Sequence, residues 1–119
     1  MKNDTTNMEK ITDLNYLIDI SKGNKVFVKE MINLFLSENP EEIKCLEKGI
    51  QEKNYDQIKA TAHKLRSTIP FIGLDKLIEK DVIGIETLAA QKGDIQEIEK
   101  HFMKIKETCE RAYFELYPV

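Results

Sequence analysis

ATAHKLRSTIPFIGL, residues 60–74, contains the end of one amphipathic helix, a break at Pro70 and the start of the next helix. Apolar residues recur at alternating steps of three and four, and at about 100° per residue they form one apolar seam. The seam consists of Tyr55, Ile58, Ala62, Leu65 and Ile69. His63 is one position past Ala62, so this spacing predicts that its side chain lies beside the seam and not in it.

Cations and small side chains surround His63 on the same helix. Lys59 lies one turn before it, and Arg66 and Ser67 lie one turn after it on the same face. Lys64 is the next residue along the chain and leans further toward solvent. An imidazole on the flank of a helix, ringed by cations and small residues, indicates a place that can hold a negatively charged group.

The segment AHKLRS, residues 62–67, resembles the signature of histidine-containing phosphotransfer (HPt) domains. The family pattern is His-x-Leu-Lys-Gly, followed by a Gly-Leu pair that starts the next helix, and residues 73–74 with Leu77 match that second part. Arg66 stands where a lysine is usual and Ser67 where a glycine is usual. Both substitutions keep a cation and a small side chain at these positions.

The resemblance covers residues 13–116 and implies a role in two-component signalling. It implies that His63 accepts a phosphoryl group from the aspartate of a receiver domain and passes it to another receiver. The chain is then a phosphocarrier with no ATP site of its own, not an enzyme. The partners implied are receiver domains of response regulators and hybrid sensor histidine kinases.

Phosphoryl transfer assigns roles to the residues around His63. A neutral imidazole is a nucleophile near physiological pH because its unperturbed pKa is about 6.5. Charge spreads over three phosphoryl oxygens in the transition state, so nearby cations stabilise it. The supporting residues expected are Lys64, Arg66, Ser67 and Lys59. The family also implies a polar residue on the following helix that orients the inner ring nitrogen, for which Glu86 is one candidate and Glu79 a weaker one.

The sequence lacks the motifs of several common enzyme and metal-binding classes. The chain has no Gly-rich phosphate loop, His-Glu-x-x-His or Gly-x-Ser-x-Gly motif. A di-metal bundle needs Glu-x-x-His motifs, but Ala60 and Ile98 precede the two histidines by three positions, so we expect no metal and no cofactor. His101 is interpreted as a surface or helix-packing residue. The alternative function is a helical adaptor, a pseudo-HPt domain that binds a receiver or kinase without carrying phosphate.

Composition limits the class of protein. The 119 residues fit one domain, and a net charge of −3 with 33% charged residues of mixed sign argues against nucleic acid as a partner. No stretch approaches the ~20 apolar residues of a membrane span. Cys45 and Cys109 each fall on an apolar stripe, which predicts buried, reduced thiols. We therefore expect a cytoplasmic protein, with a monomer sufficient for function.

The pattern along the chain predicts only helices. After a flexible segment over 1–12, Asp13 begins a short helix with Leu14, Leu17, Ile18 and Ile20 inward. Pro40 predicts either a kinked helix over 25–52 or two abutting helices. Further helices are expected over 55–69 and 74–91, the latter with apolar positions at Leu74, Leu77, Ile78, Val82, Ile85, Leu88 and Ala89 and with Gly84 at its middle.

The last predicted helix has the most regular pattern. Gly93 closes the preceding helix and Asp94 caps the new one. Its apolar stripe is Ile95, Ile98, Phe102, Ile105, Cys109, Ala112 and Leu116. Short connections favour antiparallel neighbours, so the fold expected over 13–117 is all-α, an antiparallel up-down four-helix bundle with a short extra N-terminal helix. A receiver is expected to dock on apolar residues among Ile11, Leu17, Ile20, Val26, Ile69, Phe71 and Ile72.

Overall fold

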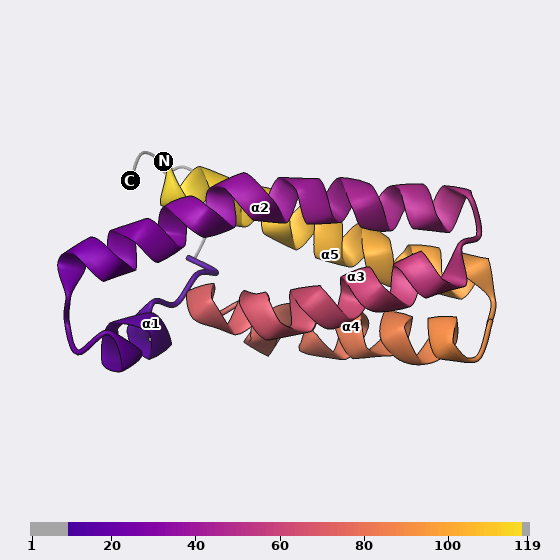
Figure 1. The fold of residues 1–119 in the computed structure, drawn as a ribbon, viewed down its shortest axis with the longest axis horizontal. Helices are drawn as coiled ribbons and strands as arrows, with labels where there is room; N and C mark the ends of the chain where they lie inside the picture. Colours follow the sequence, from indigo (N-terminus) through magenta and orange to yellow (C-terminus); the bar gives the residue numbers. More distant parts are fainter. Residues whose placement is uncertain (1–9, 118–119) are drawn as a thin grey trace, which may run out of the picture.

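Helices make up all the regular structure in the computed structural model, which describes residues 10–117. In chain order they are α1 (Asn15–Ile20), α2 (Lys25–Gln51), α3 (Tyr55–Thr68), the 3₁₀ helix η2 (Ile69–Ile72), α4 (Asp75–Ala90) and α5 (Ile95–Leu116). The four long helices form a bundle in which α3 and α5 each pack against both α2 and α4 (Figure 1). Successive long helices run in opposite directions, and the all-α prediction is confirmed.

Short polar caps begin three of the long helices. The side-chain oxygen of Asn24 accepts from two backbone N–H groups at the start of α2, and Asn54 and Asp94 each accept from one at the starts of α3 and α5. These caps satisfy donors that have no partner inside the helix. The connections that lead into these three helices are three or four residues long. Such short connections place consecutive helices side by side.

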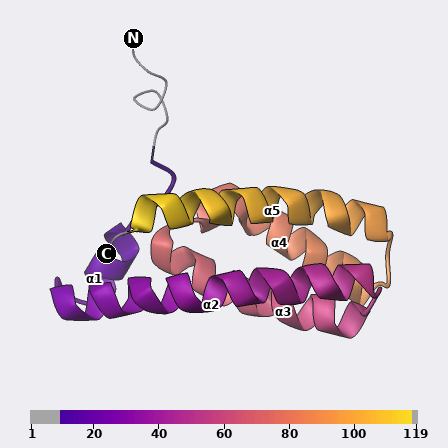
Figure 2. The same cartoon turned by 90° about the horizontal axis from the view of Figure 1, so that it is seen from above.

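Pro40 lies inside α2, which continues from Lys25 to Gln51 as one helix. Of the two predicted outcomes, the single helix is the one observed. The N-terminal part of α2 is inclined to the remainder in Figure 1, as expected where a proline removes a backbone donor and crowds the preceding turn. α1 lies at the same end of the molecule as this inclined part and packs against η2 (Figures 1 and 2).

The predicted seam of α3 lies in the core. Ile58, Ala62, Leu65 and Ile69 are fully buried, and the stripe of α5 from Ile98 to Leu116 is buried as well. Two predicted core positions are wrong: Ile18 and Ile20 are exposed. α1 packs against η2 through one side, on which Leu17 is fully buried, so its other apolar residues face outward. Leu77 is likewise exposed, whereas its neighbour Ile78 is fully buried.

The turn before α4 depends on Gly73. The sequence predicts that the helix ends at Pro70. In the structure α3 ends at Thr68, the chain continues as η2, and it then turns at Gly73, whose φ is +76°. A Cβ on this residue would lie 2.6 Å from Cβ of Asp13 and 2.7 Å from its carbonyl oxygen. Asp13 also donates its backbone N–H to the carbonyl of Ile72. The glycine therefore permits both the left-handed backbone and the close approach of the segment before α1.

The segment predicted as flexible, 1–12, is described from residue 10 onward. Backbone N–H groups of Ile11 and Thr12 donate to the carboxylate of Glu115 on α5, at 3.0–3.1 Å. The Thr12 hydroxyl donates to the same carboxylate. Burial opposes the ionised form of Glu115, but these bonds and Arg111 outweigh it and lower the pKa of Glu115. The rest of the predicted flexible segment lies outside the described residues.

The two cysteines differ, although the sequence predicts that both are buried. Cys109 on α5 is buried, and burial raises its pKa to about 12. Cys45 on α2 is exposed, and that part of the prediction is wrong. Its neighbour Leu46 is the fully buried residue, whereas the Cys45 sulfur lies 3.4 Å from Oγ1 of Thr61 and 3.5 Å from Nε2 of Gln57.

Candidate functional site

His63 lies on the flank of α3, outside the buried seam. Its neighbours Ala62 and Leu65 are fully buried, whereas 73% of its own side chain is exposed. The predicted placement beside the seam is therefore confirmed. A reactive group in this position can be reached by another protein without disturbing the core.

Glu86 on α4 holds the inner nitrogen of the ring. Nδ1 of His63 is 2.9 Å from Oε2 of Glu86, whose side chain is 18% exposed. An ionised carboxylate only accepts hydrogen bonds, so Nδ1 carries the proton and Nε2 carries the lone pair. No hydrogen bond to Nε2 is made from the described part of the chain. Glu79, the weaker candidate for this role, is exposed, and among the described residues no hydrogen bond or ion pair joins it to His63.

Arg66 is the cation nearest this pair. Its Nη1 lies 3.6 Å from Oε1 of Glu86, a distance suited to an ion pair but too long for a hydrogen bond. Within the described residues Oε1 makes no hydrogen bond. The guanidinium is half-exposed and shares the carboxylate of Glu86 with the imidazole of His63.

Lys64 points to the opposite side of α3. Its Nζ is 3.5 Å from Oε2 of Glu42 on α2, a carboxylate that is buried. Burial raises the pKa of Glu42, and the charge of Lys64 opposes that rise. The sequence groups Lys64 with the supporting residues of His63, but the structure pairs it across the α2–α3 interface.

The two remaining predicted residues have different surroundings. The Ser67 hydroxyl donates to the backbone carbonyl of Lys64 at 2.7 Å, within its own helix. Lys59 is exposed one turn before His63, and no ion pair links it to any residue among 10–117. Ser67 is thus a small side chain next to His63 whose hydroxyl is bonded within its own helix. Lys59 adds a solvated positive charge.

His101 has a comparable set of neighbours. Its Nδ1 is 2.9 Å from Oδ1 of Asp81 on α4, and Nζ of Lys104 is 3.4 Å from the other oxygen of Asp81. The ring lies against α4 at Gly84, where a Cβ would be 3.1 Å from Nε2. The interpretation of His101 as a helix-packing residue is confirmed, and the same contact explains the glycine in the middle of α4.

Apolar side chains are exposed on α1 and the first turns of α2. Of the predicted docking residues, Ile20 and Val26 are exposed, Ile11 and Phe71 are partly buried, and Leu17, Ile69 and Ile72 are fully buried core residues. Tyr16, Phe27 and Leu34 are exposed as well, although they are not among the predicted docking residues. Their positions follow the same helical period as core residues, so the pattern alone does not separate the two groups.

Residues 10–117 contain neither a cluster of metal-ligating side chains nor a helix that could span a membrane. No group of three or more histidine, cysteine, aspartate or glutamate side chains is arranged to hold a metal ion there. In the same residues, no helix is long and apolar enough to cross a membrane.

The helices that form the His63 site match the model of a known protein family. The model of the Hpt domain family matches residues 30–112, which is more than half of the chain and includes His63, Arg66 and Glu86. The chain belongs to the Hpt domain family. No curated protein and no solved structure matches the chain in the corresponding comparisons. Hpt domains are phosphocarriers that interact with receiver domains and kinases in two-component phosphorelays, and this Hpt domain has the all-helical bundle of that family.

Proposed function

We propose that this Hpt domain is a phosphorelay carrier whose phosphorylated residue is His63. One observation supports the proposal best: the ring is anchored through Nδ1 by Glu86 and is otherwise exposed. The donor is an aspartyl phosphate of one receiver domain, and the acceptor is an aspartate of another. Every group placed around His63 comes from α3 and α4 of the same chain, so one copy of the protein is enough.

The transfer step follows from the geometry of the ring. The Nε2 lone pair attacks phosphorus, a P–N bond forms, and the P–O bond to the receiver carboxylate breaks with its electron pair left on that carboxylate. The ring gains positive charge while Nδ1 keeps its proton, and the carboxylate of Glu86 stabilises that charge. The reverse sequence delivers the phosphoryl group to the next aspartate.

Arg66 is the cation that we assign to the phosphoryl oxygens. It already lies beside Glu86, and a guanidinium can make two parallel bonds to a phosphoryl group. Lys59 adds positive charge on the same face, and Ser67 leaves room for the receiver. Lys64 has a smaller part, since its ammonium group is paired with Glu42 on the far side of α3.

Transfer from a panel of phosphorylated receiver domains tests the proposal. Intact mass measured at neutral to alkaline pH should show one added phosphoryl group on the wild type, labile in acid, and none on His63→Gln. His101→Gln is the matched control and should accept phosphate like the wild type. A folded protein that binds receivers tightly but takes phosphate from none of them would contradict this function and support the adaptor alternative.

A further inference from the structure

A short segment before α1 ties two distant parts of the bundle together. Residues 10–14, which we call the strap, have no regular secondary structure. The strap is bonded to the C-terminal end of α5 through Glu115 and to the turn between η2 and α4 through Asp13. These two attachments differ in strength.

The attachment to α5 depends on one carboxylate. Both oxygens of Glu115 accept from the backbone N–H of Ile11, at 3.1 and 3.0 Å. Oε1 also accepts from the backbone N–H and from the hydroxyl of Thr12, at 3.0 and 2.9 Å. Hydrogen bonds to an ionised acceptor are stronger than bonds between neutral groups. Loss of this carboxylate would therefore take the acceptor from two successive N–H groups of the strap.

The attachment to the turn is the weaker one. The backbone N–H of Asp13 donates to the carbonyl of Ile72 at 2.9 Å, and the Asp13 carboxylate lies 2.8 Å from Nζ of Lys76. The lysine side chain is 70% exposed, and an ion pair this exposed adds little stability. The strap is therefore held chiefly by Glu115.

α1 adds little support of its own. It has six residues, and a helix of this length is not stable in isolation. No side chain caps its N-terminus, and Leu17 is its only buried residue. α1 packs against η2, where the rings of Tyr16 and Phe71 lie 6.0 Å apart. This helix therefore depends on the strap that leads into it.

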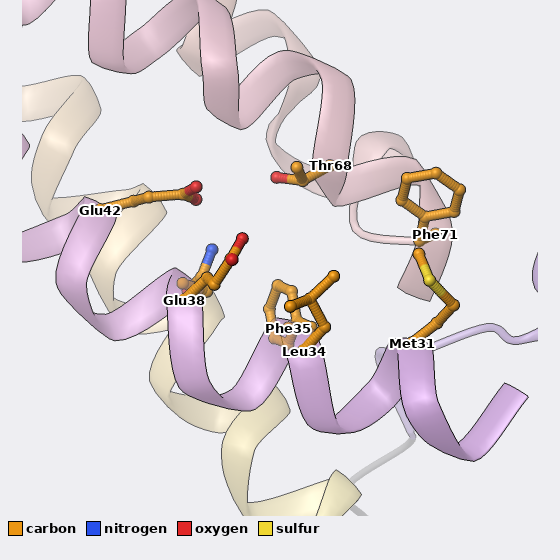
Figure 3. A pocket seen from close by; sticks show the side chains of 8 residues that line it. Met31, Leu34, Phe35, Glu38, Glu42, Thr68 and Phe71 are labelled. Atoms are coloured by element: carbon orange, nitrogen blue, oxygen red, sulfur yellow. The ribbon is translucent and has the colours of Figure 1, made fainter. Parts of the chain in front are cut away.

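The side of η2 that faces α2 is incompletely packed. Phe71 and Met31 lie at one end of an apolar cavity of about 70 Å³ between η2 and α2 (Figure 3). Phe71 thus has α1 on one side and the cavity on another. Without the ring of Tyr16, Phe71 would have room to turn.

We propose that residues 10–20, the strap and α1 together, form a clasp that opens from the bundle as one unit. Glu115 is the latch of this clasp, and the turn over 21–24 is its hinge. Lys22 and Gly23 have φ of +55° and +77° in this turn. A Cβ on Gly23 would meet no atom within 4 Å, so the turn is not packed against the bundle there.

Opening of the clasp changes the apolar surface at this end of the molecule. Tyr16, Ile18 and Ile20 are exposed on α1 and move with it. In the closed clasp these side chains are held beside η2, which directly follows the helix that carries His63. The clasp is independent of phosphotransfer, because none of its attachments involves the His63 site.

Amide hydrogen exchange of the full chain, followed by NMR, tests the latch. The informative amides are those that keep their acceptors in Glu115→Ala, namely Asp13, Ile18 and Ser21. All three should exchange at least tenfold faster, by the same factor, while amides of α3 do not change. Glu110→Ala removes an exposed carboxylate of α5 and should change none of them. Unchanged exchange at Ile18 and Ser21, or faster exchange throughout α3, would overturn the proposal.

A substitution in α1 tests whether the strap and the helix open together. Leu17 is fully buried and Ile20 is 45% exposed on the same helix, so they form a matched pair. Leu17→Ala should speed exchange at Thr12 by the same factor as at Ile18, although the bonds to Glu115 are intact. Ile20→Ala should change neither rate. Faster exchange at Ile18 alone would mean that the two parts open separately, and the single clasp would be wrong.

Discussion

His63 and His101 have similar partners and different surroundings. Nδ1 of each ring is 2.9 Å from a carboxylate oxygen on α4, provided by Glu86 and Asp81 respectively. The second oxygen of each carboxylate lies near a cation three residues after the histidine on its own helix, at 3.6 Å and 3.4 Å. In both cases the carboxylate selects Nδ1 as the protonated nitrogen, so Nε2 is the nitrogen left to react.

The two rings differ in what Nε2 meets. The ring of His101 lies on the backbone of α4 at Gly84, and its side chain is 32% exposed. The side chain of His63 is 73% exposed. A histidine–carboxylate–cation arrangement is therefore not by itself a reactive site. The surroundings of Nε2 distinguish His63, the nucleophile that we propose, from His101, which packs two helices together.

Replacing His63 by glutamine should affect phosphate acceptance, whereas replacing His101 by glutamine should affect stability. The loss of acceptance in His63→Gln is the largest effect that we expect. His63→Gln should lose phosphate acceptance completely and keep its Tm, because the side chain is exposed. His101→Gln should keep acceptance and lose about 1–2 kcal/mol of stability, since the mostly buried Asp81 loses a hydrogen-bond partner. Intact mass and thermal unfolding measure the two properties. Unfolding of His63→Gln would contradict its placement outside the core.

Leu65 tests the seam beside His63. It is fully buried, and Leu65→Ala should lower the free energy of unfolding by about 2–5 kcal/mol, as truncations of core leucines do. Urea denaturation measures the change, with Leu77→Ala as the exposed control. A loss below 1 kcal/mol in Leu65→Ala would mean that α3 is rotated from the orientation described.

The two carboxylates of α4 should differ in their effect on transfer. Glu86→Gln keeps an acceptor for Nδ1–H but removes the negative charge that stabilises the ring in the transition state. The transfer rate should fall by about tenfold, equivalent to about 1.4 kcal/mol. Asp81→Asn is the control and should leave the rate unchanged. Single-turnover transfer from a phosphorylated receiver measures both, and equal rates in the two variants would show that Glu86 has no role in transfer.

Gly84→Ala should disturb only the His101 side of α4. The new Cβ would lie 3.1 Å from Nε2 of His101, so the ring must move. The better helix propensity of alanine, up to ~1 kcal/mol, opposes this cost. We expect a net loss of about 1 kcal/mol or less in urea denaturation and no change in phosphate acceptance. When Gly84→Ala is made in the His101→Ala variant, it should instead stabilise the protein, because the imidazole that would clash with the new Cβ is absent.

A third carboxylate–cation pair, Glu42 with Lys64, gives the smallest effect. Burial raises the pKa of Glu42 in the folded protein. Its ionised form is therefore less favourable in the folded than in the unfolded state, so this residue lowers stability as pH rises above about 4.5. Glu42→Gln should gain stability slightly, relative to wild type, between pH 4 and pH 7 in urea denaturation. A relative loss over that range would show that the ion pair with Lys64 outweighs burial.

Local periodicity predicted which face of each long helix is buried. The seam of α3 and the stripe of α5 appear in the core as predicted, because every turn of a helix repeats the same face. The exposed position of His63 followed from the same argument. Lys64 did not, because it pairs with Glu42 on the other side of α3. The predictions of burial were wrong at Ile18, Ile20 and Cys45. The first two lie on a short helix that packs through one side, and Cys45 lies beside Leu46, which takes the core position.

The sequence by itself determined the helices, their buried faces, the membership of the Hpt family and the histidine that stands outside the core. Only the tertiary structure decided which residues meet across helices. It brought Glu86 to His63 over 23 positions and turned Lys64 toward Glu42. Such pairs depend on how each helix is rotated and shifted against its neighbour. That rotation and shift result from the packing of the whole core and leave no mark in the period of a single helix.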